Sequence, residues 1–134
     1  MIYKLSIKTR SKVEFQDITH EVQKTVQSGG TLNGICYVYV PHTTAAVTIN
    51  EHADPRVVDD IAAQLDEIAP QNKHYRHMEG NSPAHIKASL MGDSRILFIE
   101  DGKLVLGTWQ GIFFGEFDGP RIRSVLVKIA VDKT

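Results

Sequence analysis

The chain has 134 residues, is 42% hydrophobic and 23% charged, and carries a formal net charge of -1. A chain of this size buries roughly two thirds of its unfolded surface, so it needs neither disulfides nor a structural metal merely to fold. The near balance of 15 basic and 16 acidic residues argues against a nucleic-acid partner. No apolar run approaches the roughly 20 residues that cross a bilayer, so we expect no membrane partner.

Cys36 is the single cysteine, so the chain cannot form an internal disulfide. No basic segment followed by an apolar stretch stands at residues 1–4, which argues against secretion. We therefore expect the protein in the reducing cytoplasm. Cys36 lies in a β-rich apolar run, and we expect it to be a small buried apolar residue.

The first half of the chain alternates strand and helix patterns. β-rich or alternating segments predict strands at 2–7, 34–40 and 45–50. Between the first two, Asp17 or Thr19 is a candidate cap for a helix. Its apolar positions Ile18, Val22 and Val26 recur every four residues, and two glycines end it at 29–30.

Two helices are predicted in the middle of the chain, each opened by a capping residue and a proline. Asp54 and Pro55 begin the first, which carries an apolar stripe and stops at Pro70. Ser82 and Pro83 begin the second, which runs to residue 91 and closes at a glycine. The polar stretch 71–81 between them has no period, and its length suggests a functional loop.

The last third predicts an antiparallel meander with strands at 95–99, 104–117 and 122–131, joined by turns at 101–102 and 118–120. The middle strand has apolar or small residues on both faces, so both faces should be covered. Fully extended, it would span about 46 Å, whereas a compact chain of this length is about 36 Å across. Either a glycine bulge bends this strand or it extends into a neighbouring subunit.

The common nucleotide, hydrolase and metal motifs are absent, because the chain has no Walker A loop, GxGxxG, GxSxG, HExxH or CxxC. Three polar clusters remain as candidates at the ends of predicted elements. They are 41–44 with Asn50 and Glu51, the stretch 74–85 with three histidines, and 107–110 with Trp109 and Gln110.

His85 is the most informative histidine, because it falls in the first turn of the helix that begins at Ser82. The positive end of the helix dipole disfavours a protonated ring there, and the neutral ring is the form that binds metal. A surface or hydrogen-bonded histidine is the alternative. Several nearby groups are candidates for binding phosphate; they are Gly80, Asn81 and Ser82 at the helix entry, with Lys87, Arg121 and Arg123.

Three segments together resemble one family: HTTAAVTINE at 42–51, EGNSPAHIKASLMG at 79–92 and LGTWQGI at 106–112. This is the YjbQ-like family, also called the secondary thiamine-phosphate synthase family. The resemblance covers nearly the whole chain in length and motif order. One departure is Gly115, where the family often has cysteine, so a thiol role cannot apply at that position.

The resemblance implies a single YjbQ-like domain over residues 1–134, an α+β fold of largely antiparallel sheet with about three helices, and assembly as a homotrimer. It also implies a metal and ligand site, formed by motif from His42, Asn50, Glu51, His77, His85 and Gln110. The implied activity joins a pyrimidine diphosphate to a thiazole phosphate, giving thiamine phosphate and pyrophosphate. The divalent ion is open, because Mg²⁺ prefers oxygen ligands whereas His42, His77 and His85 suit Zn²⁺.

The leading hypothesis is an enzyme that acts on a phosphorylated small molecule. In this hypothesis His85, Glu51 and Gln110 are catalytic. The substrate-binding residues are Asn50, Gly80, Asn81, Ser82, Lys87, Trp109 and Arg121. A metal-dependent hydrolase and a non-catalytic trimer that binds metal or ligand are the two alternatives.

Overall fold

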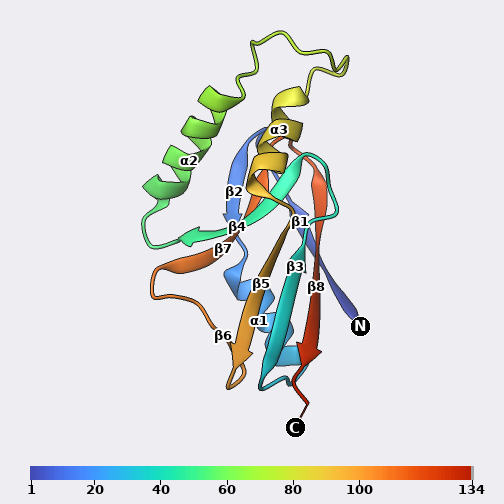
Figure 1. Cartoon of the computed structure of the whole chain (residues 1–134), viewed down its shortest axis with the longest axis vertical. Helices are drawn as coiled ribbons and strands as arrows, with labels where there is room; N and C mark the ends of the chain where they lie inside the picture. Colours follow the sequence, from blue (N-terminus) through green and yellow to red (C-terminus); the bar gives the residue numbers. More distant parts are fainter. Residues whose placement is uncertain (134) are drawn as a thin grey trace.

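The computed structural model describes residues 1–133, which form two antiparallel sheets and three helices (Figure 1). The larger sheet, in the order β1-β8-β3-β5-β6, contains β1 (Ile2–Lys8), β8 (Ile122–Val131), β3 (Gly34–Tyr39), β5 (Ser94–Glu100) and β6 (Lys103–Leu104). The smaller sheet, in the order β2-β7-β4, contains β2 (Glu14–Asp17), β7 (Gln110–Glu116) and β4 (Ala45–Glu51). The helices are α1 (Thr19–Ser28), α2 (Pro55–Ile68) and α3 (Ser82–Met91). The predicted α+β class is confirmed.

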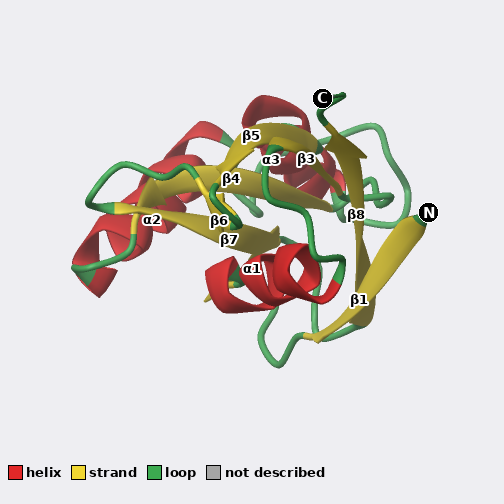
Figure 2. Cartoon of the chain, turned by 90° about the horizontal axis from the view of Figure 1, so that it is seen from below, coloured by secondary structure: helices red, strands yellow, loops and turns green. Residues whose placement is uncertain are grey.

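One hydrophobic core joins the two sheets and α1. Val38 of β3 and Phe114 of β7 are both fully buried in it, as are Val22 and Val26 of α1. Figure 2 shows α1 beside β7 on one side and the β1–β8 edge on the other, so this helix closes the open side of the two sheets. Cys36 is buried in the same core, as predicted, and burial raises the pKa of its thiol to about 11.

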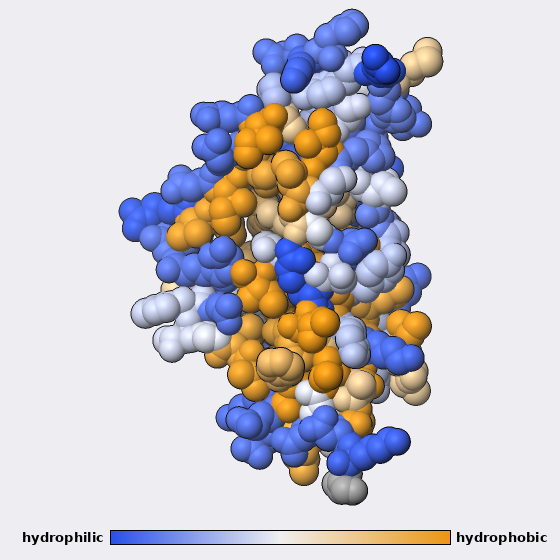
Figure 3. All heavy atoms as spheres, viewed as in Figure 1, coloured by the Kyte–Doolittle hydropathy of each residue, from blue (hydrophilic) through white to orange (hydrophobic). Residues whose placement is uncertain are grey.

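On β3 and β5 the outer face of the larger sheet is apolar and open to solvent. On β3 and β5 the residues that alternate with the core are Tyr37, Tyr39, Ile96 and Phe98, which are 41%, 45%, 62% and 64% exposed. Figure 3 shows orange side chains gathered over these strands in the lower half of the molecule. We call these four residues the outer apolar face. Exposed apolar patches of this kind on a small domain often mark interaction sites.

The two proline-headed helices begin close to where the sequence predicts. Asp54 caps α2, and its carboxylate accepts a hydrogen bond from the Arg56 amide at 3.0 Å. The cap of α3 is Asn81, one residue before the predicted Ser82, and Gly92 ends this helix at φ 99°. No helix in residues 1–133 is long and apolar enough to cross a membrane.

The region before α1 departs from the prediction. Residues 14–17 form β2, a strand that pairs with β7 and that the sequence pattern does not announce. The helix cap is Ile18, and neither predicted residue occupies that position. Asp17 instead accepts a hydrogen bond from the Thr19 amide at 3.0 Å, so it stabilises the helix entry from one residue further out.

The predicted long strand at 104–117 is wrong. Its first residue ends β6 in the larger sheet, whereas residues 110–116 form β7 in the smaller sheet. Between them the chain turns, and Oε1 of Gln110 accepts a hydrogen bond from the Gly107 amide at 2.8 Å. Because segment 104–117 passes from one sheet to the other, its length fits within the domain. Neither a bulge nor an overhang into another subunit is needed.

The predicted hairpin at 118–120 is also wrong, because β7 and β8 belong to different sheets. β7 pairs with β2 and β4, and β8 pairs with β1 and β3. The hairpin between β5 and β6 is confirmed. The predicted burial of both faces is confirmed for β7, in which residues 111–116 are all buried. The turn at 118–120 therefore links the two sheets beside the cleft described below.

Candidate functional site

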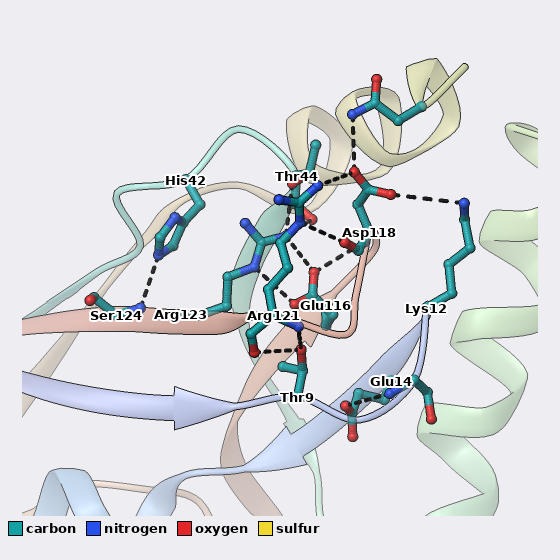
Figure 4. A network of polar contacts seen from close by, with 12 residues as sticks. Thr9, Lys12, Glu14, His42, Thr44, Glu116, Asp118, Arg121, Arg123 and Ser124 are labelled. Carbon is teal, nitrogen blue, oxygen red and sulfur yellow. Dashed lines mark hydrogen bonds and ion pairs between the residues drawn. The ribbon is translucent and has the colours of Figure 1, made fainter. Parts of the chain in front are cut away.

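His42 lies in the loop after β3, and the backbone near the start of β8 holds its ring in place. Its Nε2 accepts a hydrogen bond from the backbone amide of Ser124 at 2.9 Å (Figure 4). Because an amide can only donate, Nε2 is unprotonated and a neutral ring carries its proton on Nδ1. Burial and the nearby Arg123 charge lower the pKa of His42, and the Glu116 charge offsets this only in part. The neutral ring of His42 therefore has one hydrogen-bond donor, its Nδ1–H.

We expect His42 to make the protein sensitive to mild acid. Its folded pKa lies below the ordinary 6.5, so the unfolded chain binds more protons as the pH falls below that value, and stability declines. Urea unfolding at pH 7.5 and pH 5.5 measures this decline. A glutamine at position 42 keeps an acceptor for Ser124 without titrating, so H42Q should show a smaller decline than the original chain. Equal declines would contradict this assignment.

His77 and His85 face each other across the entry to α3. Their ring centroids are 5.4 Å apart, and the ring planes are inclined by 85°. Nε2 of His77 also lies 3.8 Å from a carboxylate oxygen of Glu79. His85 belongs to the first helical turn, as predicted, whereas His77 lies in the connection between α2 and α3. These two rings form one wall of a shared cleft.

His42 and His85 both line two adjoining pockets of about 440 Å³ and 470 Å³, which we call the histidine cleft. The first extends along α3 past Ser89 to Asp93. The second is lined by Pro41, His42, Thr43, Thr44, His77, Glu79, Asn81, His85, Arg121 and Arg123. Ser82 lies nearby, in a smaller pocket of about 350 Å³ that also contains His77 and His85. Volumes in this range accommodate a small molecule.

A buried ion pair lies beside the cleft, with Arg123 in the lining of the cleft (Figure 4). Glu116 is fully buried and Arg123 is 6% exposed. Arg123 donates to Glu116 from Nε at 2.8 Å and also from Nη2, and Thr9 donates to the same carboxylate at 2.7 Å. Burial alone would raise the pKa of Glu116, but hydrogen bonds from Arg123, Thr9 and the Asp118 amide, with the Arg123 charge, hold it below its ordinary value.

Arg123 keeps one edge of its guanidinium available. Nε is bound to Glu116, and Nη2 is bound to Glu116 and to the hydroxyl of Thr44 at 2.8 Å. Within residues 1–133 Nη1 has no hydrogen-bond partner, although Arg123 lines the cleft. Arg121 also lines the cleft, but it is half-exposed and lies outside β8.

Asp118 organises the rim of the cleft. Arg121 and Asn81 both donate to its carboxylate at 3.0 Å, and Lys12 lies 3.8 Å away. Burial raises the pKa of Asp118, but these partners together lower it below its usual value. Oδ1 of Asn81 is buried without a hydrogen-bond partner in the described part of the chain. A buried unsatisfied acceptor at the edge of a cleft is a position where a ligand or water would bind.

A second group of predicted site residues lies at the opposite end of β4. Glu51 pairs in register with Gln110, and its carboxylate accepts a hydrogen bond from the Asp54 amide at 3.2 Å. Trp109 is 63% exposed beside them, and Asn50 is exposed on the same strand. Glu51 is six positions along β4 from Ala45 at the cleft, a span of about 20 Å on a strand. One chain therefore does not bring Glu51 or Gln110 to His85.

Lys87 also lies away from the histidine cleft. It is two residues from His85, a rotation of about 200° around a helix, so the two side chains leave opposite faces of α3. Lys87 is buried and paired with Asp66 of α2. Gly80 stays at the entry to α3, where a positive φ of 78° suits glycine and its carbonyl accepts from Gln71 at 2.8 Å.

The three predicted metal ligands do not meet at one point. Nε2 of His42 is committed to Ser124, and its Nδ1 carries the proton, so this ring has no free lone pair for a metal. Across residues 1–133 no group of three histidine, cysteine or acidic side chains has an arrangement that could hold a metal ion. The predicted three-histidine site therefore does not fit the side chains of one chain.

Sequence reasoning missed Glu116 and the pair of Asp17 with His52. The signal for Glu116 was a single acid within the apolar run 112–117, where a charge must find a buried partner. His52 lies 2.9 Å from Asp17, and its ring occupies the space that a side chain at Gly111 would need. Spacing offers no signal for that pair, because its two residues come from different elements.

Comparison with known proteins gives a consistent result. A family model described as UPF0047 protein YjbQ-like matches residues 3–132. A UPF0047 protein of Methanocaldococcus jannaschii is 52% identical over 133 residues, covering 99% of this chain and 96% of the relative. UPF0047 protein YugU of Bacillus subtilis is 48% identical over 130 residues, covering 96% and 98%.

Solved structures agree with these relatives. A crystal structure of a yjbq/upf0047 family protein from Clostridium acetobutylicum is 55% identical, with a TM-score of 0.93 over 96% of this chain and 99% of that chain. A hypothetical protein from Aeropyrum pernix is 37% identical, with a TM-score of 0.94 over 98% and 99%. The fold is thus shared over essentially the full length.

Proposed function

Since the chain belongs to the YjbQ-like UPF0047 family, we propose that its histidine cleft binds and acts on a phosphorylated small molecule. Thiamine phosphate synthesis from a pyrimidine diphosphate and a thiazole phosphate is the specific candidate. One observation carries this proposal: the neutral donor His42, the histidine pair at the α3 entry and the open edge of Arg123 line the same cleft.

The charge arrangement supports recognition of a phosphate. A guanidinium N–H donates a charge-assisted hydrogen bond to a phosphate oxygen, and partial burial strengthens that attraction. Arg123 is anchored by Glu116 and Thr44, so its open Nη1 is held in place before a ligand arrives. The side chain of Asn81 makes no capping hydrogen bond to α3, and Asn81 and His85 both line the cleft, so the positive end of the helix lies at the cleft.

The proposed reaction forms a bond between the thiazole nitrogen and the methylene carbon of the pyrimidine. The carbon–oxygen bond to the diphosphate breaks, and its electron pair leaves with pyrophosphate. Arg121 and Arg123 stabilise the charge that develops on the leaving group. The neutral ring of His85 is placed to donate a hydrogen bond to a leaving phosphate oxygen. Residues 1–133 of one chain hold no group of three side chains arranged to bind the expected divalent ion, so none of these roles is assigned to a metal.

The direct test is to incubate purified protein with both precursors and to measure thiamine phosphate and pyrophosphate. We expect the two products in equal amounts, and each precursor alone should release little pyrophosphate. Pyrophosphate release from the pyrimidine diphosphate alone would favour a hydrolase instead. Failure to form either product would refute the candidate reaction. The free, buried thiol of Cys36 supports a cytoplasmic setting for this activity.

We also propose that the working unit is a homotrimer, supported by the outer apolar face defined above. A trimer would bury that face, and it offers a route by which Glu51 and Gln110 of one chain approach the histidine cleft of another. The roles predicted for these two residues depend on such an approach.

Aspartate in place of Phe98 should dissociate the assembly, because a charge would be buried in an apolar contact. Phe98 is 64% exposed in the isolated chain, so the fold should tolerate the change. Sedimentation equilibrium should give a mass of three chains for the original protein and one for F98D. Glu67→Lys, at an exposed position of α2, is the matched control and should leave the mass unchanged. A monomeric original protein would contradict the trimer.

A further inference from the structure

Lys87 is a buried cation that the proposed reaction does not use. The residue is 4% exposed, so most of its hydration is lost on folding. An ammonium group has three donors, yet the one hydrogen bond that Nζ makes within residues 1–133 is to Asp66. Burial of a charge with so few partners costs free energy that other contacts must offset. This lysine therefore has donor capacity that the chain itself leaves open.

The partner of Lys87 is weakly fixed. The Asp66 side chain is 60% exposed, and it projects from α2, a helix without a fully buried residue. Figure 1 shows α2 leaning away from the sheets beside α3. A solvated carboxylate on such a helix is easily displaced, because leaving the ion pair returns it to water. An anionic ligand that binds Lys87 more strongly would therefore displace Asp66.

Lys87 and Asp66 line a pocket of about 500 Å³ between α2, α3 and the loop before β2, which we call the α2–α3 pocket. Val13, Pro70 and Phe117 supply apolar walls, and Lys12 also lines the pocket. Lys12 is loosely held, because its nearest carboxylate is 3.8 Å away and its side chain is 56% exposed. Two ammonium groups and one carboxylate leave the pocket with net positive charge.

We propose that the α2–α3 pocket is a second ligand site, which binds a small carboxylate with an apolar or aromatic body. The carboxylate would replace Asp66 at Lys87, and Lys12 would contact its second oxygen. The apolar body would lie against Val13 and Phe117. A few charged side chains in a mainly apolar pocket of this volume match the usual construction of small-molecule sites. This site is separate from the histidine cleft, and the proposal does not depend on the function proposed there.

Calorimetric titration with 3-phenylpropionate tests the site. We expect saturable binding of this acid and at least about tenfold weaker binding of the neutral 3-phenylpropionamide, because a hydrogen bond to a charged group is lost. Lys87→Met should weaken binding of the acid by a similar factor. Asp66→Asn should instead tighten it severalfold, because the internal competitor is removed. His85→Ala should leave it unchanged, since His85 faces the other cleft.

The Asp66 variant decides between a ligand site and a purely structural ion pair. In a structural pair Asp66→Asn would loosen α2, and affinity for the acid would be unchanged or lower. This variant alters an exposed side chain, so it remains informative even if Lys87→Met fails to fold. Equal binding of the acid and the amide, or no saturable binding of either, would overturn the proposal.

Discussion

Alanine in place of His85 should lower kcat for the proposed reaction by about 100-fold or more, the usual contribution of a positioned hydrogen-bond donor to a developing negative charge. The ring faces His77 and lines the histidine cleft, where negative charge develops on a leaving phosphate oxygen. The expected loss falls on kcat more than on KM, because this hydrogen bond strengthens in the transition state and phosphate binding rests on the arginines. Product formation under saturating substrate measures it.

His20→Ala is the matched control for that variant. His20 is an exposed histidine on α1, in a different pocket, so the same substitution there should keep kcat within about twofold of the original value. A H85A protein whose kcat stays within tenfold of the original would remove His85 from its proposed role. Circular dichroism on both variants excludes unfolding as the cause of a loss.

Glutamine in place of Glu116 should destabilise the fold by about 3–5 kcal/mol, the usual cost of leaving a buried charge without its partner. The substitution keeps the shape of the side chain, but it leaves the guanidinium of Arg123 buried at 6% exposure without a countercharge. The free energy of unfolding in urea measures the loss. Removing both charges, as in Glu116→Leu with Arg123→Met, should recover much of it, because apolar replacements often equal a buried pair.

Acid should remove the same stabilisation from the original chain. The pKa of Glu116 is lower in the folded state than its ordinary 4.5, so its contribution is complete above that value and is lost as the pH falls through the folded pKa. Glu100→Gln, an exposed carboxylate on β5, is the control and should change stability by less than about 0.5 kcal/mol. Equal unfolding free energies for E116Q and E100Q would contradict the role of the ion pair.

The helices were predictable because their signals are local. Asp54 with Pro55 marks the start of α2, and the glycine at position 92 marks the end of α3, since caps and φ preferences act within one turn. The strands at 34–39 and 122–131 were likewise evident from alternation. β2 was missed because four residues of mixed polarity carry too little pattern, and their pairing with β7 is a long-range contact.

The sequence predicted which residues line the candidate site better than it predicted how those residues are arranged. His42 and His85 do share a cleft, and Asn81 and Arg121 lie at its rim. Their meeting depends on contacts such as that between His42 and Ser124, which are 82 positions apart in the chain. Conversely, Lys87 is a neighbour of His85 in sequence but faces another pocket, because the helix turns its side chain to the opposite side.

The sequence by itself determined the family, the α+β class, the helix boundaries to within a residue or two and the residues able to carry chemistry, because these follow from local preference and residue type. Only the tertiary structure decided which of those residues meet. Pairing of β7 with β2 and β4 placed Glu116 under Arg123, and the same pairing carried Gln110 to the far end of β4 from the histidines. Sheet pairing joins distant segments through backbone hydrogen bonds that all residue types share, so no local pattern encodes it.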